Sequence, residues 1–314
     1  MTATFIKGLE NFRFQEKNGA VTTVGTFDGI HLGHQEIFRR VRQESEKTGS
    51  SSVLVTFHPH PKVVVSPDYI PMLLTTIEEK EKFVPDFFDG QVLILEFNEH
   101  LKNMTAEQFV KEILIETIHT RKLIVGYDHA FGKNRSGNIN ELQILGKKYG
   151  FELEVVNPVI VDGEPVSSSR IRKAMTRNHY PEAIRLLGHE YAIYGVVEKG
   201  IGLGKKIGYP TANIKVSGRK LLPPDGVYAC WVQFDKEEKK GMMFIGQNHF
   251  NPLPRLSVEV NLFDFNRDIY NAELIVFPTR FIRNNLKFDS SEKLLEQLGK
   301  DKENIIGIIN KRSK

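Results

Sequence analysis

Apolar and polar positions follow two different patterns in the first part of the chain. Short runs of apolar, β-branched residues predict strands at 20–24, 52–57, 92–95, 122–126 and 151–156. Longer stretches with apolar residues at helical spacing predict helices at 35–47, 76–88, 105–117, 138–149, 166–175 and 182–187. This alternation of strands and helices predicts an α/β fold with a Rossmann-like parallel sheet.

From Tyr191 onwards the helical spacing disappears. Short strands separated by Gly and Pro turns predict an all-β barrel, and residues 290–310 predict a terminal helix that packs on it. A chain of 314 residues is long for a single core. We therefore expect two domains, 1–185 and 186–314, with a boundary near 185–190.

Composition and charge narrow the class of protein. Hydrophobic residues at 40% and charged residues at 26% are ordinary for a soluble globular protein and exclude disordered or collagen-like classes. The single cysteine, Cys230, excludes a disulfide framework and a four-thiolate metal site. Without a signal peptide or a membrane-spanning run, a cytoplasmic protein with no membrane partner is expected. The net charge of +4 suits polyphosphate ligands and does not indicate nucleic-acid binding.

Two histidines lie where the first predicted strand turns into the first helix. The motif is G-T-F-D-G followed by H-x-G-H, and it contains His31 and His34. Unpaired N–H groups make a helix N-terminus a natural phosphate site, and two imidazoles add donors. Gly33 lets a polyanion approach the backbone, while Gly25 and Gly29 permit tight turns. On spacing alone, a metal pair or two solvated side chains remain as alternatives.

Two later strands end in loops at the edge where open α/β sheets bind ligands. The strand at 52–57 is followed by His58-Pro59-His60-Pro61, in which the histidines lack the nearby partners of a zinc site. The strand at 122–126 is followed by a loop dense in Gly, Asp and Arg that includes Asp128. A plain surface loop is the alternative there.

A second phosphate-binding element is predicted at the start of the helix after residue 166. Hydroxyls of Ser167, Ser168 and Ser169 are followed by Arg170 and Arg172, which combines capping groups, N–H donors and guanidinium forks in one turn. This combination suits a triphosphate. The alternative is an ordinary capped helix with exposed arginines.

The second half carries weaker signals when its residues are taken alone. The glycine-rich run with Gly202, Gly204 and Lys205 could bind a nucleotide or form a plain turn. In the strand at 256–263, alternation places Glu259 on the face opposite the apolar residues. On that pattern alone Glu259 is a solvated outer-face residue.

Taken together, these motifs resemble a known family. The first motif resembles the signature of the nucleotidylyltransferase superfamily. Its residues are similar to those of the FMN adenylyltransferase domain of bifunctional bacterial riboflavin kinase/FAD synthetases. The T-F-x-P-H-P and S-S-T-R-I-R elements of that family appear at 56–61 and 167–172, with Ser169 in the threonine position. Its G-x-D-F-x-F-G loop appears at 126–132 with His129 and Ala130 in the middle.

The second half resembles the riboflavin kinases of the same family. G-Y-P-T-A-N at 208–213 is similar to their G-F-P-T-A-N signature, and P-x-G-V-Y-A and D-F-x-x-D-x-Y appear at 224–229 and 264–270. The resemblance implies an N-terminal nucleotidylyltransferase domain and a C-terminal riboflavin-kinase-like barrel. It implies ATP-dependent phosphorylation of riboflavin to FMN, followed by adenylylation of FMN to FAD with release of pyrophosphate.

The resemblance also implies roles for individual residues. The catalytic residues are His31, His34 and Arg170, with Glu259 as the base of the kinase. Thr211 and Asn213 point to one side of an extended segment and would hold Mg²⁺. The residues expected at the flavin are His58, Pro59 and Asp128. The residues expected at the nucleotide are Gly25, Thr26, Phe27, Asp28, Gly29, Gly33, Ser168, Ser169, Arg172, Gly202, Gly204 and Lys205.

One segment departs from the family pattern and keeps two alternatives open. Family members usually read N-I-G-x-R-P-T where residues 244–250 read F-I-G-Q-N-H-F. The first alternative is therefore an FMN adenylyltransferase with a degenerate kinase half. The second is a non-catalytic flavin-binding regulator, which is expected to lose the phosphate-handling residues that this chain retains.

Overall fold

The chain divides into two compact units in a computed structural model. The units comprise Met1–Arg170 and Ile171–Lys314, and each is described by itself. The limits 1–185 and 186–314 expected from the sequence stay a prediction. The structure describes residues 3–14, 18–66, 71–129, 131–132, 137–177, 179–200, 204, 208–247 and 256–309.

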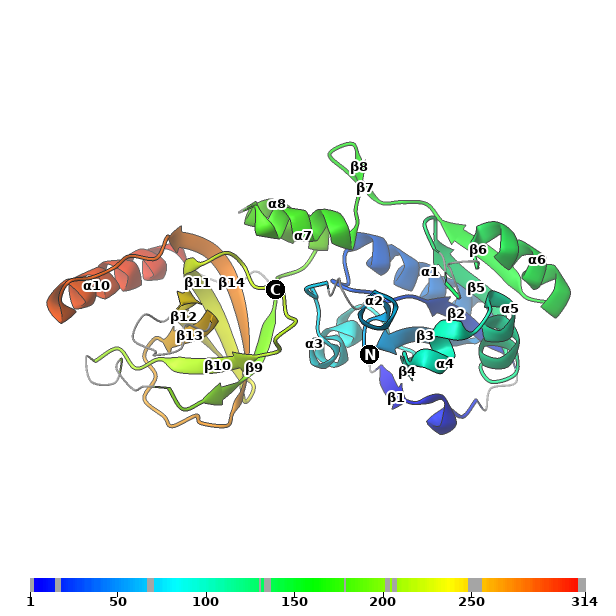
Figure 1. Ribbon diagram of the computed structural model, residues 1–314, viewed down its shortest axis with the longest axis horizontal. Helices are drawn as coiled ribbons and strands as arrows, with labels where there is room; N and C mark the ends of the chain where they lie inside the picture. The colour runs from blue at the N-terminus through cyan, green and yellow to red at the C-terminus, as the bar shows by residue number, and fades with distance from the viewer. Residues whose placement is uncertain are drawn as a thin grey trace. The chain divides into compact units, whose positions relative to one another are not determined.

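The first unit is built on a six-stranded sheet whose strands all run parallel (Figure 1). The strand order is β1-β4-β3-β2-β5-β6, which confirms the predicted Rossmann-like sheet. Five strands coincide with the predicted runs to within about two residues, whereas β1 was not expected. The strands are β1 (Thr4–Lys7), β2 (Ala20–Val24), β3 (Ser51–His58), β4 (Gln91–Glu96), β5 (Thr120–Gly126) and β6 (Glu152–Val156).

Helices cover both faces of this sheet. One apolar cluster joins α1 and the segment around Val84 to one face, and a second joins η3 and α6 to the other. The longer helical segments are α1 (Leu32–Thr48), α3 (Ile77–Phe83), the π-helix η3 (Phe109–Ile115) and α6 (Ile139–Tyr149). The short ones are η1 (Leu9–Asn11), α2 (Pro61–Val65), η2 (Val84–Asp86), α4 (Glu99–Asn103) and α5 (Ala106–Gln108).

Two of the predicted helices differ from the expectation. The stretch 76–88 ends as an α-helix at Phe83, because Pro85 follows and the chain continues as the 3-10 turn η2. The stretch 105–117 begins at a capping box on Thr105, as expected for an N-cap, but most of it is the π-helix η3. Both errors concern the ends or type of a helix and not its place in the sequence.

The second unit contains the predicted barrel. Its six strands close in the order β10-β13-β12-β11-β14-β9, with every pair antiparallel (Figure 1). The strands are β9 (Ile193–Glu198), β10 (Ala212–Val216), β11 (Gly226–Phe234), β12 (Glu237–Gln247), β13 (Leu256–Leu262) and β14 (Glu273–Arg283). The remaining elements are the hairpin β7 (Ile160–Val161) and β8 (Glu164–Pro165) in the first unit, and α7 (Ser168–Thr176), α8 (Tyr180–Leu187) and α10 (Ser291–Ile308).

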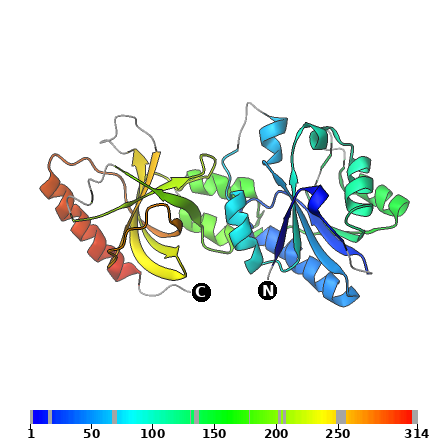
Figure 2. The same cartoon turned by 90° about the horizontal axis from the view of Figure 1, so that it is seen from below.

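The terminal helix α10 packs along the outside of the barrel, as predicted (Figure 2). Ile305 and Ile309 enter an apolar cluster with barrel residues. A buried ion pair adds a polar link, because the Arg283 guanidinium donates to both carboxylate oxygens of Asp301 at 2.7 to 3.1 Å. The Tyr180 hydroxyl ties α8 to the barrel by donating to the carbonyl of Pro278 at 2.6 Å.

Candidate active sites

The loop from β2 to α1 adopts a conformation that few residues tolerate. Phe27 and Ile30 have positive φ angles of 46° and 45°, and Gly29 between them has a φ of 94°. The Phe27 ring folds back over Gly25, where an added Cβ would lie 2.9 Å from the ring. Gly25 is therefore needed for the close approach of an aromatic ring. Strain of this kind persists only where the surrounding structure holds it in place.

The segment at residues 74–75 supplies part of that restraint. The buried Asp28 carboxylate accepts hydrogen bonds from the backbone N–H groups of Leu74 and Thr75, at 3.3 and 2.9 Å. Gly29 N–H donates to the Thr75 hydroxyl at 2.9 Å, and the Ser168 hydroxyl donates to the Asp28 carbonyl at 2.8 Å. The Asp28 and Ser168 side chains, both expected at the nucleotide, thus fix the conformation of this loop.

Lys80 on α3 also contacts this loop, and its role was not expected from the sequence. Its side chain is buried, and its ammonium donates to the Thr26 carbonyl at 2.5 Å. The same carbonyl accepts a hydrogen bond from the Thr56 hydroxyl at 3.3 Å. Burial lowers the pKa of Lys80 to about 8, and the nearby Asp28 carboxylate partly opposes that effect.

His31 and His34 come together at the N-terminus of α1, which begins at Leu32 and not at residue 35 as predicted. His31 is the N-cap residue, and its ring stacks on that of His34 with centroids 3.6 Å apart and an interplanar angle of 19°. Burial lowers the pKa of His34 well below its usual value, and the positive charges of His31 and Lys80 lower it further. An added Cβ at Gly33 would lie 3.3 Å from the His31 ring, so Gly33 makes room for this pair.

A metal ion at these two histidines would need ligands beyond the pair itself. In the described part of the chain, no group of three or more His, Cys, Asp or Glu side chains is placed to hold a metal ion. The two imidazoles beside the unpaired N–H groups of the helix instead present hydrogen-bond donors. This arrangement can bind the oxygens of a phosphate.

Arg170 on α7 contacts the β7–β8 hairpin. Its Nη1 donates to the carbonyls of Val161 and Glu164 at 2.9 and 3.1 Å, which anchors the guanidinium. Its Nη2 and Nε lie 3.9 and 3.6 Å from the carboxylates of Asp162 and Glu164, distances longer than a hydrogen bond. Ser169 on the same helix is exposed and Arg172 is half-buried.

The expected flavin residues follow strands that adjoin β2 in the sheet. His58 ends β3, Pro59 follows it, and Asp128 comes two residues after β5. Because β2 lies between β3 and β5 and all three run parallel, their carboxyl ends meet at one edge. The His58 and Asp128 side chains are exposed at that edge. The topology thus brings these residues to the same edge as the β2–α1 loop.

A second cluster of polar groups lies on the barrel. Asn213 on β10 is directly opposite Glu259 on β13, so both side chains point to the same face. The Thr211 hydroxyl donates to one Glu259 carboxylate oxygen at 3.3 Å, and the Ser257 hydroxyl lies 3.4 Å from the other. An added Cβ at Gly200 would lie 2.0 Å from the Asn213 amide, so this glycine leaves room for the amide.

The glycine-rich segment before this cluster is described only in part. Gly202 and Lys205, both expected at the nucleotide, lie outside the described residues. The Gly204 carbonyl accepts a hydrogen bond from Tyr209 N–H at 2.9 Å. A Cβ on Gly204 would lie 2.3 Å from the Tyr209 carbonyl and 3.3 Å from the Thr211 hydroxyl, so Gly204 packs directly against the signature segment.

Phe244 occupies the place where family members usually have asparagine. It lies on β12 directly opposite Glu259, and its ring packs against the apolar cluster under α10. A Cβ added at Gly246 would lie 3.0 Å from the Phe244 ring. The substituted side chain is therefore an apolar neighbour of Glu259, while residues 248–250 of the altered segment lie outside the described part.

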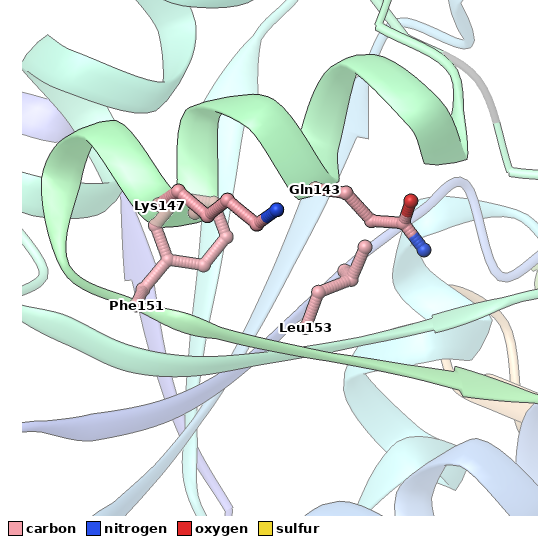
Figure 3. Close-up of a pocket in the computed structure, with 5 residues that line it drawn as sticks. Gln143, Lys147, Phe151 and Leu153 are labelled. Carbon is pink, nitrogen blue, oxygen red and sulfur yellow. The ribbon is translucent and has the colours of Figure 1, made fainter.

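A depression elsewhere in the first unit contains none of these candidates. Gln143 and Lys147 project from α6 over Phe151 and Leu153 beside it (Figure 3). Gly146 completes the lining. This depression thus lies apart from the residues that carry the chemistry.

The fold and the two polar clusters define a class of protein: a nucleotide-dependent transferase with one phosphate-binding α/β unit and one barrel unit. Family models agree with this division. The model described as FAD synthetase matches residues 13–170, and the model described as riboflavin kinase matches residues 187–309. The chain belongs to the family of bifunctional riboflavin kinase/FMN adenylyltransferases. Riboflavin, FMN, FAD and ATP are the substrates and products of this class of enzyme.

Relatives of known identity match nearly the whole chain. The bifunctional riboflavin kinase/FMN adenylyltransferase of Buchnera aphidicola from Schizaphis graminum is 36% identical over 301 residues, covering 94% of this chain and 96% of that protein. The Escherichia coli protein of the same name is 32% identical over 297 residues, covering 94% and 95%. These matches confirm the resemblance stated from the sequence and support both activities.

One solved structure is similar over the same extent. It is described as a macrolide-efflux protein from Streptococcus pneumoniae, with a TM-score of 0.83 and 31% identity over 96% of this chain and 98% of that one. In the ranges that the structure describes, this chain has no helix long and apolar enough to cross a membrane.

Proposed function

We propose that the first unit transfers the adenylyl group of ATP to FMN at the N-terminus of α1, and that the second unit phosphorylates riboflavin beside Glu259. The observation that carries the first assignment is the stacked pair of His31 and His34 at that N-terminus. The second assignment rests on the register that places Asn213 opposite Glu259, and on the Thr211 hydroxyl, which lies 3.3 Å from the Glu259 carboxylate.

In the first unit, a phosphate oxygen of FMN attacks the α-phosphorus of ATP. The new P–O bond forms as the bond to the bridging oxygen of the β-phosphate breaks, and pyrophosphate leaves with the negative charge. No protein nucleophile is required. Catalysis rests on positioning and on donors aimed at the charged oxygens, a role that suits His31, His34 and the N–H groups of α1.

Arg170 contributes to this site through the edge of its guanidinium that carries Nε and Nη2. The two carbonyl bonds of Nη1 hold the group in place, while the longer contacts of Nε and Nη2 to Glu164 and Asp162 are ion pairs that a phosphate can replace. A phosphate makes two parallel hydrogen bonds to that edge. Arg170 would therefore stabilise charge on ATP without leaving the hairpin.

In the second unit, the terminal ribityl hydroxyl of riboflavin attacks the γ-phosphorus of ATP, and ADP leaves. Glu259 accepts the proton of that hydroxyl. The oxygen donors of Thr211 and Asn213 fit Mg²⁺, which prefers hard oxygen ligands, and Gly200 leaves space beside the Asn213 amide. When bound there, Mg²⁺ neutralises phosphate charge.

One incubation tests both assignments and separates them from the alternatives. The purified chain is mixed with riboflavin, ATP and Mg²⁺, and riboflavin, FMN and FAD are separated over time, with a parallel reaction started from FMN. We expect FMN to appear first and FAD to follow. FAD from FMN without FMN from riboflavin would favour the adenylyltransferase with a degenerate kinase half. Flavin binding with neither product would favour the regulator.

A further inference from the structure

The buried lysine under the β2–α1 loop has no part in the function argued so far. Lys80 is 7% exposed, although its helix α3 also offers positions that face solvent. A lysine is almost never buried without a specific polar partner. Its partner is the main-chain carbonyl of Thr26, the residue that precedes the left-handed Phe27.

The direction of the Thr26 carbonyl matters for phosphate binding. A loop that accepts a polyanion has to present N–H groups to it, and a carbonyl dipole turned the same way would repel the phosphate oxygens. The Thr26 carbonyl is instead directed at the Lys80 ammonium of α3 and the Thr56 hydroxyl of β3. Both donors thus hold it in a single direction.

We propose that Lys80 is a positioning residue for ATP in the adenylyl-transfer site: it holds the Thr26 carbonyl toward α3, so that the β2–α1 loop keeps its phosphate-accepting conformation. This inference rests on the proposed function of the first unit. Lys80 acts through the backbone and touches neither substrate. Its loss therefore weakens the binding of ATP more than the chemical step.

The experiment compares Lys80→Met, Lys80→Arg and the control Lys82→Met in the full chain. Met removes the donor at similar length, Arg keeps a charged donor, and Lys82 is an exposed lysine of the same helix. We expect Lys80→Met to raise the KM for ATP in FAD synthesis by about tenfold to a hundredfold, the loss typical of one hydrogen bond to a charged group. Its kcat should change less, and Lys80→Arg should recover part of the loss.

Riboflavin phosphorylation by the same preparations is the internal control, because its KM for ATP belongs to the barrel. A merely structural role would lower the thermal midpoint of Lys80→Met and leave both KM values unchanged, which would overturn the proposal. If Lys80→Met does not fold, Thr56→Val removes the other donor to the Thr26 carbonyl. It should raise the same KM by a smaller factor, and an unchanged KM would again contradict the proposal. A wild-type chain that makes no FAD from FMN would instead refute the proposed function itself.

Discussion

The environment of His34 predicts which of its ring nitrogens donates to the substrate. The pKa of His34 lies well below its usual value, so the imidazole is neutral near pH 7 and carries a single N–H. Its Nδ1 is buried and has no hydrogen-bond partner among the described residues. A buried N–H without a partner is avoided more strongly than a buried acceptor, so the proton is expected on Nε2.

Two amide substitutions separate the ring nitrogens. In His34→Gln the amide N–H falls near the position of Nε2, whereas in His34→Asn it falls near Nδ1. Loss of one preorganised donor costs roughly two to three orders of magnitude in kcat, or about 2.7–4 kcal/mol, so His34→Ala and His34→Asn should lose that much FAD synthesis. We expect His34→Gln to retain at least about ten times the kcat of His34→Asn.

The assay is FAD formation from FMN at saturating ATP and pH 7.5, with riboflavin phosphorylation as the control for folding. Equal rates for the Gln and Asn variants, or a faster Asn variant, would refute the assigned tautomer. Near-wild-type rates in all three variants would show that His34 does not bind phosphate.

The lowered pKa of His34 also makes the stability of the protein depend on pH. Below its ordinary pKa of 6.5, His34 is protonated in the unfolded chain but remains neutral in the folded one. The unfolded state then binds more protons, so the free energy of unfolding falls as the pH drops below about 6.5. His34→Gln lacks this proton uptake and should lose less stability than wild type between pH 7 and pH 5.

Three further predictions concern the barrel and the independence of the units. Glu259→Gln should lower the kcat of riboflavin phosphorylation by about a hundredfold or more and leave FAD synthesis from FMN unchanged, as product separation would measure. Asp301→Ala leaves the Arg283 guanidinium without its carboxylate and should destabilise the barrel by about 3 kcal/mol in urea unfolding, with partial recovery in the double variant that also carries Arg283→Met. Fragments 1–185 and 1–176 should both convert FMN to FAD. The shorter one should aggregate less, because it omits the apolar residues of α8 that the second unit buries.

The strands of the first unit could be predicted because of how they are buried. All five residues of β2 are buried, and five consecutive residues of β3 are buried, so each strand reads as a run of apolar and β-branched residues with no charged position. The edge strand β1 has only β4 as a neighbour and no buried residue, and its short sequence T-F-I-K carries little signal. The other edge strand, β6, is longer, has one buried residue and was predicted, so the short length of β1 and its lack of buried residues explain why it was missed.

The residues of the first site differ in how far they could be predicted from the sequence. The spacing of His31 and His34 is local, and a motif can carry it. The contact between Lys80 and Thr26 joins residues far apart in the sequence, and the fold alone brings them together. One signal was available: Lys80 lies three residues after Ile77 and four before Val84, both of which pack on the sheet, so the lysine shares their buried face.

The two sites therefore depend on the fold for different reasons. At Glu259 the geometry follows from strand register, because a slip of one residue between β10 and β13 would turn Asn213 or Glu259 to the opposite face. The geometry of the β2–α1 loop does not come from pairing between strands. Its strained backbone is held by individual hydrogen bonds that join separate segments to Asp28 and Thr26. Removing one of those bonds changes the loop while the sheet stays intact. The adenylyl-transfer site is thus the one in which a buried residue that touches no substrate can still control how tightly ATP binds.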